Sequence, residues 1–411
     1  MTGSISGMWR RRAEKRMRGA GVELSLRPFV GQMVLALGLL SLTLLARPAL
    51  AVTMDSPEWK ALMAAAKAEG TLSVAGYGSR EYDDVYTEFA KKYGIKMVIS
   101  FAGGSEHADR ILAERRAGIY AVDVGHVGAN TVNRRLIPAK AVAPIKPYLM
   151  LDEVTDPKNW YGDRLWFIDE QQQYVLAHSA DFERAFVLFI NTKLVKDEDL
   201  KALRSPDDLL SEKWKKKVVA LSPNVGQVGN SYFRYSILPE PFGLAWMERF
   251  VKSGMIEFVS NSRLIEDGLA GGKYAFAVFP NAPPLDQMEK QGLPVKRVEH
   301  EFADVPGIMT AGAPTQAVQV YDRAPHPNAA KLFVNWLLSR EGMTYVHDHP
   351  TNSPFARNSL RKDVPKTNVD PATLPEAGIE YYAVDALPEF QSQRDGIMKK
   401  VQDWYKAAPR P

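Results

Sequence analysis

The sequence predicts an α/β fold divided into two lobes, and three observations lead to this expectation. Short apolar strands are followed by a glycine-containing loop and an amphipathic helix, a pattern typical of a largely parallel sheet covered by helices. The pattern occurs in two sets, separated by a different middle region. The chain of 411 residues is also longer than the roughly 250–300 residues that one hydrophobic core serves.

The first set of elements lies between residues 56 and 125. Ser56 is expected to cap a helix that buries Trp59 on its apolar face and ends at Gly70, a residue that readily takes the left-handed conformation. After it, strands and helices alternate. We expect strands at 71–75, 96–101 and 121–124, and helices at 82–93 and 106–117.

The second set follows a middle region, residues 140–182, which is rich in proline and aromatic residues and predicts no long helix. We expect a strand at 186–190, before the second set begins. The second set then has strands at 216–221, 273–279 and 317–321, a helix beginning near Tyr232 and another at 328–338. Residues 358–376 contain many prolines and charges, so we expect a surface loop there.

Residues 1–51 have the parts of a cleavable export signal. A basic segment precedes an apolar run of fourteen residues at 33–46, and Ala49-Leu50-Ala51 has the small-x-small pattern that signal peptidase requires. A membrane-spanning helix needs about 20 apolar residues, so the length of the run disfavours the alternative of an uncleaved anchor. We expect Sec export and a mature chain that begins after Ala51. No cysteine follows the cleavage point to carry a lipid, so we expect a freely diffusing protein in the periplasm of a Gram-negative cell.

The positive net charge belongs to this signal. Residues 1–51 hold eight of the 52 Lys and Arg residues and two of the 48 Asp and Glu residues, which leaves 44 basic and 46 acidic residues in the mature chain. A chain with this balance has no basic footprint for nucleic acid, and we expect no nucleic-acid partner. The chain contains no cysteine, so its hydrophobic cores and not disulfides must hold it together.

The motifs of several common enzyme classes are missing from the sequence. It contains no Gly-x-Ser-x-Gly elbow and no thiol nucleophile. Gly272-Lys273 lacks the first glycine of a phosphate loop, and Gly76-x-Gly78 is followed by Glu81 instead of a third glycine. His347 and His349 form the one close histidine pair, which we interpret as a loop pair without a metal. We therefore expect no catalytic residue, no metal site and no cofactor.

Several segments resemble the periplasmic solute-binding proteins of ABC importers, in the group that contains ferric-iron, thiamine and phosphorylated-compound binders. The segments are Trp59-x9-Glu69-Gly70 before a strand, Phe189-Ile-Asn-Thr-Lys-Leu194, Trp214-Lys-x-Lys217 with Ser222-Pro-Asn, and APHPNAAKLFVNWLLSREG at 324–342. The resemblance extends from about Trp59 to Arg357 and is most specific in the last segment.

The resemblance implies a two-lobed type II periplasmic binding protein fold with two crossover hinge strands and a ligand between the lobes. Residues 52–192 and 303–411 are expected to form lobe I, and residues 193–302 lobe II. It also implies a protein that captures a small solute and delivers it to an inner-membrane ABC permease, as a monomer. A ligand-presenting subunit of a membrane sensor is an open alternative, and a secreted hydrolase is disfavoured by the missing catalytic motifs.

Ferric-binding members of the group use two adjacent tyrosines after the strand that corresponds to 274–279. This chain has Pro280-Asn281-Ala282-Pro283 there, while its own adjacent pair, Tyr381 and Tyr382, lies near the C-terminus. Hard ferric iron prefers oxygen donors such as phenolate, so direct iron binding is the less favoured alternative.

The expected ligand is instead a polar or anionic organic molecule, bound by loops where strands end and helices begin. Exposed backbone N–H groups and the positive end of the helix dipole favour anionic groups in such loops. The candidate ligand-binding residues are Tyr77, Ser79, Ser105, His126, Asn224, Gln227, Asn230, Ser231 and Asn281.

Overall fold

The computed structural model describes residues 51–77, 82–183, 187–224, 229–299, 307–313, 315–348, 358–369, 371–384 and 390–408. The predicted export signal lies outside these residues. Within them, no helix combines the length and the hydrophobicity needed to cross a membrane.

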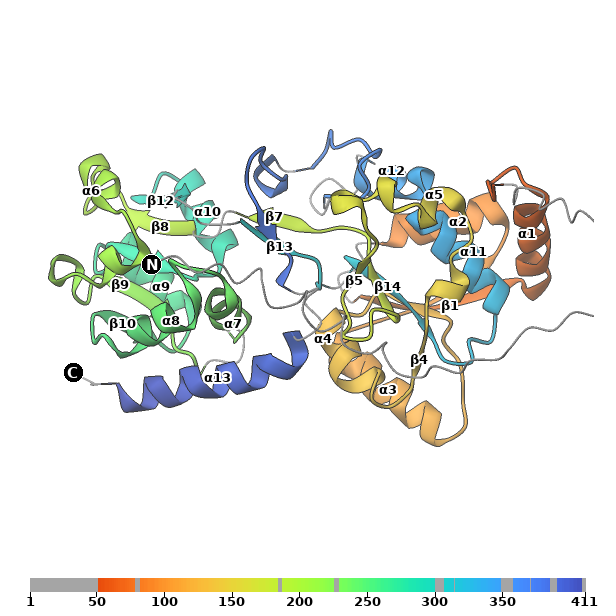
Figure 1. Ribbon diagram of the computed structural model, residues 1–411, viewed down its shortest axis with the longest axis horizontal. Helices are drawn as coiled ribbons and strands as arrows, with labels where there is room; N and C mark the ends of the chain where they lie inside the picture. The colour runs from red at the N-terminus through yellow and green to blue at the C-terminus, as the bar shows by residue number, and fades with distance from the viewer. Residues whose placement is uncertain are drawn as a thin grey trace, which may run out of the picture. The chain divides into compact units, whose positions relative to one another are not determined.

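The first of the two larger sheets has strand order β2-β1-β3-β14-β6-β5, with β4 paired to β14 (Figure 1). Strands β1, β2 and β3 run parallel, while β14 pairs antiparallel with β3, β4 and β6. The strands are β1 (Thr71–Tyr77), β2 (Lys96–Ala102), β3 (Val124–Gly125), β4 (Val142–Ala143), β5 (Trp166–Phe167), β6 (Val175–Ala177) and β14 (Ala317–Tyr321).

Helices cover this sheet and bury one continuous hydrophobic core with it. They are α1 (Pro57–Glu69), α2 (Asp83–Tyr93), α3 (Gly104–Arg116), α4 (Ala129–Thr131), α5 (Asp152–Thr155), α11 (Pro327–Leu338) and α12 (Arg340–Asp348), with a π-helical turn, η2 (Val132–Leu136), after α4. Helix α11 is buried along nearly its whole length, which explains why its sequence is apolar on every side. The middle region, as predicted, forms no long helix.

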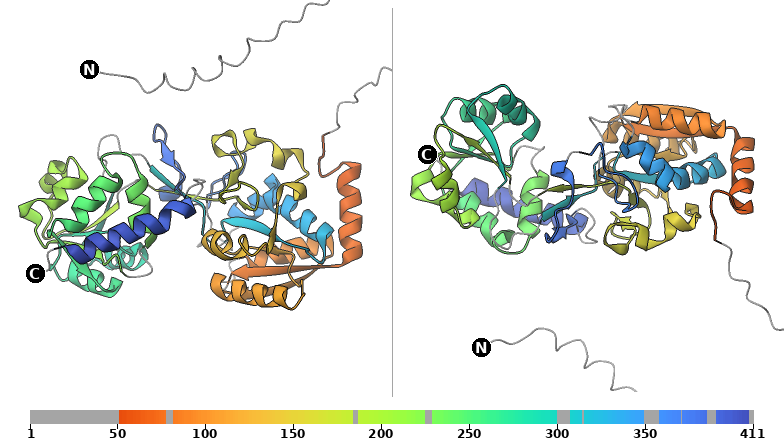
Figure 2. Two further views of the ribbon diagram at one scale, coloured as in Figure 1. Left: turned by 60° about the horizontal axis from the view of Figure 1, so that its bottom comes forward. Right: turned by 90° about the horizontal axis from the view of Figure 1, so that it is seen from above.

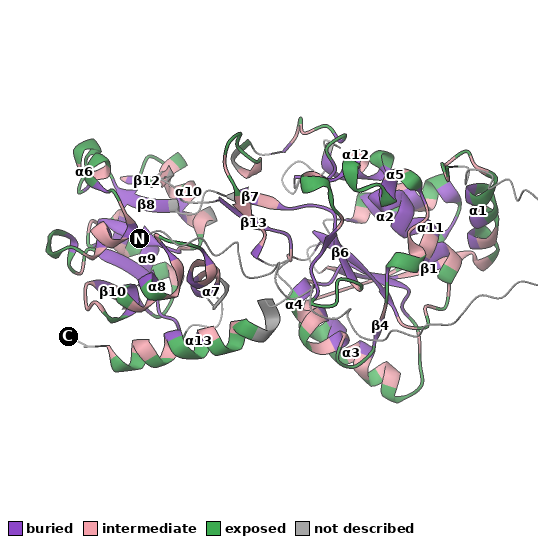
Figure 3. Ribbon diagram, in the orientation of Figure 1, coloured by how far each residue is buried: buried purple, intermediate pink, exposed green. Residues whose placement is uncertain are grey.

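The second sheet has strand order β10-β9-β11-β8-β12 and a separate hydrophobic core. Strands β9, β10 and β11 run parallel, and β8 pairs antiparallel with β11 and β12. Its elements are β8 (Val187–Asn191), α6 (Asp197–Ala202), β9 (Val218–Leu221), α7 (Gly229–Ile237), α8 (Gly243–Lys252), β10 (Ile256–Val259), α9 (Ser262–Ala270), β11 (Phe276–Val278), α10 (Ala282–Lys290) and β12 (Val295–Glu299). Most strands of both sheets are largely buried (Figure 3), whereas β2, at the edge of the first sheet, contains no buried residue.

A third, small sheet joins the two. It has the order β15-β13-β7, formed by β7 (Asp181–Glu183), β13 (Gly307–Thr310) and β15 (Tyr381–Tyr382). Strands β7 and β13 are the two crossover strands. The segment Phe189–Leu194, which resembles the first crossover of the solute-binding group, lies instead at the end of β8 in the second sheet. The third strand, β15, comes from the C-terminal part of the chain and was not expected.

The C-terminal helix α13 (Phe390–Ala407) belongs to the second core. It lies along α7 and α8 (Figures 1 and 2), and its Met398 and Val401 are buried among the residues of that core. The lobe boundaries inferred from the resemblance place all of 303–411 in lobe I. The packing of α13 instead associates this last segment with lobe II.

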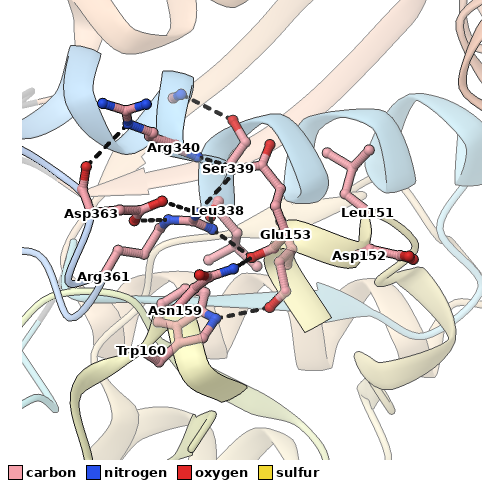
Figure 4. Close-up of polar contacts among 12 residues, drawn as sticks. Leu151, Asp152, Glu153, Asn159, Trp160, Leu338, Ser339, Arg340, Arg361 and Asp363 are labelled. Atoms are coloured by element: carbon pink, nitrogen blue, oxygen red, sulfur yellow. Dashed lines mark hydrogen bonds and ion pairs between the residues drawn. The ribbon is translucent and has the colours of Figure 1, made fainter. Parts of the chain in front are cut away.

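The prediction of a surface loop at 358–376 is wrong for the beginning of this segment. Ser359, Leu360 and Arg361 are buried, and Val364 and Val369 are buried as well. The guanidinium of Arg361 is held by Asp363, two residues along the chain, and by Glu153 and the carbonyl oxygen of Leu338 on other elements (Figure 4). A charged and proline-rich composition therefore does not predict exposure here, because distant partners neutralise the charge.

Glu69, the last residue of α1, caps a second helix. Its carboxylate accepts hydrogen bonds from the backbone N–H groups of Asn328 and Ala329, at 3.1 and 2.8 Å, in the first turn of α11. An acidic group at this position satisfies free N–H groups and complements the helix dipole. In the Glu69-Gly70 pair, Gly70 thus ends α1 and Glu69 caps the start of α11.

Replacing Glu69 with alanine is expected to lower the free energy of unfolding by about 1–2 kcal/mol, as the loss of a helix cap does. Urea unfolding of the mature protein measures the change. Lys67→Ala, an exposed substitution in the same helix turn, is the control and should stay within about 0.5 kcal/mol of wild type. Equal effects of the two substitutions would contradict the capping role.

Candidate ligand-binding site

We call the side of each sheet where its parallel strands end the carboxyl edge. In both sheets this edge lies on the side where the chain passes to the other sheet. In the first sheet β6 is parallel to β3, because both pair antiparallel with β14, and β6 leads through three residues into the crossover strand β7. In the second sheet the first residues of β8 pair with the carboxyl end of β11. Ligands of open α/β sheets bind at such edges, so both edges are candidate site surfaces.

The edge of the first sheet carries Tyr77 at the end of β1 and Ser105 in the first turn of α3. Gly103 precedes this helix and provides no side chain to cap it. Ser105 is exposed, and its backbone oxygen accepts a hydrogen bond from Nη1 of Arg135 at 3.2 Å. This guanidinium also pairs with Asp109. The start of α3 therefore offers N–H donors beside the guanidinium of Arg135. Arg135 was not predicted as a site residue.

Gly104 and Gly125 have a steric role at this edge. A Cβ atom on Gly104 would lie 2.8 Å from Oγ1 of Thr131, and one on Gly125 would lie 2.8 Å from the hydroxyl oxygen of Tyr321. The glycines that mark the strand-to-helix loops in the sequence are thus needed for close packing below the edge.

His126, a predicted contact residue, is fully buried beneath the edge. Its Nδ1 is 2.8 Å from the hydroxyl oxygen of Tyr86, and its ring lies 4.8 Å from that of Tyr82, centroid to centroid. Burial lowers the pKa of His126 to about 3 and raises the pKa of Tyr86 well above its usual value, so both groups are neutral. In this conformation His126 is part of the core below the site.

His178 lies next to His126, with 6.2 Å between the ring centroids. It is also fully buried, and neither of its ring nitrogens finds a hydrogen-bond partner among the described residues. Burial, followed by the neighbouring histidines, lowers its pKa well below the usual value. No sequence pattern predicts that these two histidines are neighbours, because they lie 52 positions apart in the chain.

The edge of the second sheet carries Asn224, Ser231 and Asn281. Asn224 follows β9, and its backbone N–H donates to the hydroxyl of Ser222 at 3.3 Å. Asn281 precedes α10; it is exposed, and its side chain does not cap the helix. Ser231 is half-buried in the first turn of α7. Ser79 and Gln227 lie outside the described residues, and so does the side chain of Asn230.

Two aromatic residues at this edge were not predicted as site residues. The ring of Tyr235 stacks on that of Phe279 at 4.4 Å between centroids, and Phe279 follows β11 with a φ of 55°. A bulky side chain rarely adopts this left-handed conformation, and such residues concentrate at binding sites. Tyr232 and Phe250 pack around Phe279 and hold it in place.

Within the described ranges, no group of three or more His, Asp or Glu side chains is arranged to hold a metal ion. His347 is buried in α12, with its ring 6.4 Å from that of His178. The interpretation of His347 and His349 as an exposed loop pair is therefore wrong for His347, and His349 lies outside the described residues.

The sequence profile described as "Bacterial extracellular solute-binding protein" matches residues 73–344, which is more than half of the chain. A comparison with curated protein sequences finds no match.

Many solved structures are similar in fold. Iron-bound HitA from Pseudomonas aeruginosa is 20% identical, with a TM-score of 0.52 over 80% of this chain and 99% of that one. The Trichodesmium protein IdiA (FutA), in complex with iron and citrate, is 18% identical, with a TM-score of 0.57 over 81% and 98%. AfuA from Actinobacillus pleuropneumoniae, with bound fructose-6-phosphate, is 14% identical, with a TM-score of 0.50 over 82% and 98%.

Proposed function

Because the chain belongs to the bacterial extracellular solute-binding protein family and has the type II periplasmic binding protein fold, we propose that it captures a small polar or anionic organic solute. The solute binds between the carboxyl edges of the two sheets, and the protein delivers it to the inner-membrane permease of an ABC importer. The observation that carries this proposal is the position of both edges at the ends where the chain crosses between the sheets.

The donors at the two edges support an anionic or strongly polar ligand. Helix α3 begins there after Gly103, without a side-chain cap, so its first N–H groups are available to a ligand. Helix α7 also begins with a glycine, Gly229. Arg135, paired with Asp109, lies beside the start of α3 and adds a guanidinium donor. Ser105, Ser231 and Asn281 supply neutral hydrogen-bonding groups, which give direction to the binding of an organic molecule.

Ferric iron is the competing ligand, since two of the structural relatives were solved with iron. The segment after β11 begins with Phe279, Pro280 and Asn281, and none of these has a phenolate or carboxylate oxygen to offer. The adjacent tyrosines of this chain form β15 in the small third sheet. The chemistry of the donors therefore favours the organic solute.

A thermal-shift screen of the mature protein tests the proposal. Phosphorylated sugars, carboxylates, polyamines and ferric citrate are added separately, with free citrate as the control for the last. A ligand at 100 times its dissociation constant adds about 2.7 kcal/mol to the free energy of unfolding, which raises the melting temperature. Stabilisation by a phosphorylated or carboxylate compound is expected. Stabilisation by ferric citrate alone would show that iron is the solute.

Substitutions at the two helix starts test the position of the site. Ser105→Ala and Asn230→Ala are each expected to raise the dissociation constant of the compound found in the screen at least about tenfold. A hydrogen bond to a charged group contributes about 1.5–3 kcal/mol, and about 1.4 kcal/mol corresponds to a factor of ten. Thr87→Ala is the control, since this exposed hydroxyl bonds only within α2. Affinities measured by calorimetry that equal wild type in both site variants would remove the helix starts from the binding site.

A further inference from the structure

The third strand of the small sheet ties the two cores together. Strand β15 pairs in parallel with β13, which pairs antiparallel with β7. The backbone N–H of Gly307 donates to the carbonyl oxygen of Glu380 at 2.7 Å, which fixes the register at the start of the pairing. The junction between the cores therefore has a C-terminal strand beside its two crossover strands.

Successive residues of β15 pack against different cores. Tyr381 packs against the first core and Tyr382 against the second, and the alternation continues with Ala383 and Val384. The partner strand β13 behaves in the same way, with Ile308 in the second core and Met309 in the first. This follows from strand geometry, because adjacent side chains point to opposite faces. A rotation of one core against the other must move both faces of this sheet.

Tyr381 has a closely fitted position in the sheet. Its ring covers Gly307, where a Cβ atom would lie 2.3 Å from ring carbons of the tyrosine. The ring meets that of Phe182 on β7 edge to face at 5.0 Å, and the hydroxyl accepts a hydrogen bond from the backbone N–H of Glu376 at 3.0 Å. The tyrosine thus bridges all three strands, and only glycine at 307 leaves room for it.

The segments on both sides of β15 are firmly anchored. Before it, Arg361 is fixed to the first group of elements by the carboxylate of Glu153 and by the carbonyl oxygens of Glu153 and Leu338 (Figure 4). After it, α13 is part of the second core, where the ring of Tyr405 packs against that of Phe258 at 5.3 Å between centroids. We call the described residues 358–369, 371–384 and 390–407 the C-terminal strap.

Helix α13 also contacts the first group of elements. The guanidinium of Arg134, in η2, forms two hydrogen bonds with the carboxylate of Asp395, at 2.9 and 3.1 Å. The pair is exposed, so its contribution to the free energy of unfolding is small. Its two parallel hydrogen bonds nevertheless favour one orientation of this end of α13.

We propose that the C-terminal strap is a restraint on the hinge, with Tyr381 as its pivot, and that it limits how far the two cores rotate when solute binds. The proposal rests on the function proposed above, since it assigns the strap to the opening and closing of that site. The two adjacent tyrosines, which form β15 in the small sheet, thereby acquire a mechanical role.

Spin-label distance measurements on the solute-free protein test the restraint without knowledge of the solute. The chain has no cysteine, so Lys67→Cys in α1 and Lys290→Cys in α10 provide two unique, exposed labelling positions on the two cores. Three changes are compared in this background: Tyr381→Ala, Gly307→Ala and Tyr381→Phe. Urea unfolding of each variant is measured in parallel.

Tyr381→Ala is expected to broaden the distance distribution between the labels, and Gly307→Ala to shift it, because the new methyl group displaces the ring. Tyr381→Phe keeps the ring and should retain the wild-type distribution. The double variant Gly307→Ala/Tyr381→Ala should match Tyr381→Ala alone. Distributions identical to wild type in folded Tyr381→Ala and Gly307→Ala proteins would overturn the restraint, whatever the solute proves to be.

Discussion

Replacing Arg361 with methionine is expected to lower the free energy of unfolding by about 3 kcal/mol, the lower part of the range for breaking a buried ion pair. The side chain of Arg361 is completely buried, while its partners Glu153 and Asp363 are about one-third exposed. The substitution leaves both carboxylates without their cation, but water reaches them and reduces the cost.

The backbone partners of Arg361 add to this effect. Its Nη1 donates to the carbonyl oxygens of Glu153 at 2.9 Å and Leu338 at 3.2 Å, and the guanidinium lies over the ring of Trp160 at 5.6 Å (Figure 4). Methionine fills much of the same volume without donating to either carbonyl. The carbonyl oxygen of Glu153 keeps a second donor, Nδ2 of Asn159 at 3.0 Å, whereas the buried carbonyl of Leu338 loses its bond from Arg361, which is destabilising.

Lys362→Met is the matched control for this experiment. It removes a neighbouring cation whose ion pair with Asp163 is exposed, and exposed pairs contribute about 0–1 kcal/mol. Urea unfolding followed by circular dichroism gives both values. A loss below about 1 kcal/mol for Arg361→Met, or equal losses in the two variants, would contradict the structural role given to Arg361.

Lowering the pH from 7.5 to 5.0 is expected to reduce the free energy of unfolding by about 4 kcal/mol through His126 and His178 alone. Both are neutral in the folded protein because burial lowers the pKa of each. The unfolded chain binds a proton on each imidazole below a pKa of about 6.5, so each contributes about 2 kcal/mol at pH 5.0. This stability is fully present above pH 6.5 and is lost as the pH falls toward the folded-state values.

His178→Phe separates this effect from other titrations. Phenylalanine keeps an aromatic ring beside Tyr82 but takes up no proton, so the pH-dependent loss is expected to shrink by about 2 kcal/mol. Phe333→Leu, next to His126, is the control: it lowers stability at every pH and leaves the slope unchanged. Unfolding curves between pH 5.0 and 7.5 that have the same slope in His178→Phe and wild type would contradict the prediction.

The sequence contained enough information for the elements that depend on local pattern. The helix from Ser56 to Gly70 and the strands at 71–75 and 96–101 follow from periodicity, capping and glycine placement, and the structure confirms them within a few residues. The short strands β4, β5 and β6 of the same sheet were not predicted. The strand expected at 121–124 is observed as β3, which contains only Val124 and Gly125, because only these two residues pair with β1 and β14.

The features that local pattern could not predict depend on contacts distant in sequence. The burial of Arg361 requires Glu153, the cap on α11 requires Glu69, and the strand at Tyr381 requires Gly307. His126 was predicted as a surface contact because it follows a strand. It is buried because Tyr82 and Tyr86, from a separate helix, cover it.

The position of α13 also affects the order of events in biosynthesis. The second core contains residues from Leu188 to Val401, and the first contains residues from Trp59 to Val364. Neither can be completed while the later segments remain on the ribosome. Contacts of such large sequence separation form slowly, so a nascent chain stays in an unfolded, translocation-competent state for longer. For the Sec export that the sequence predicts, in which the chain passes a channel unfolded, the late closure of both cores is an advantage.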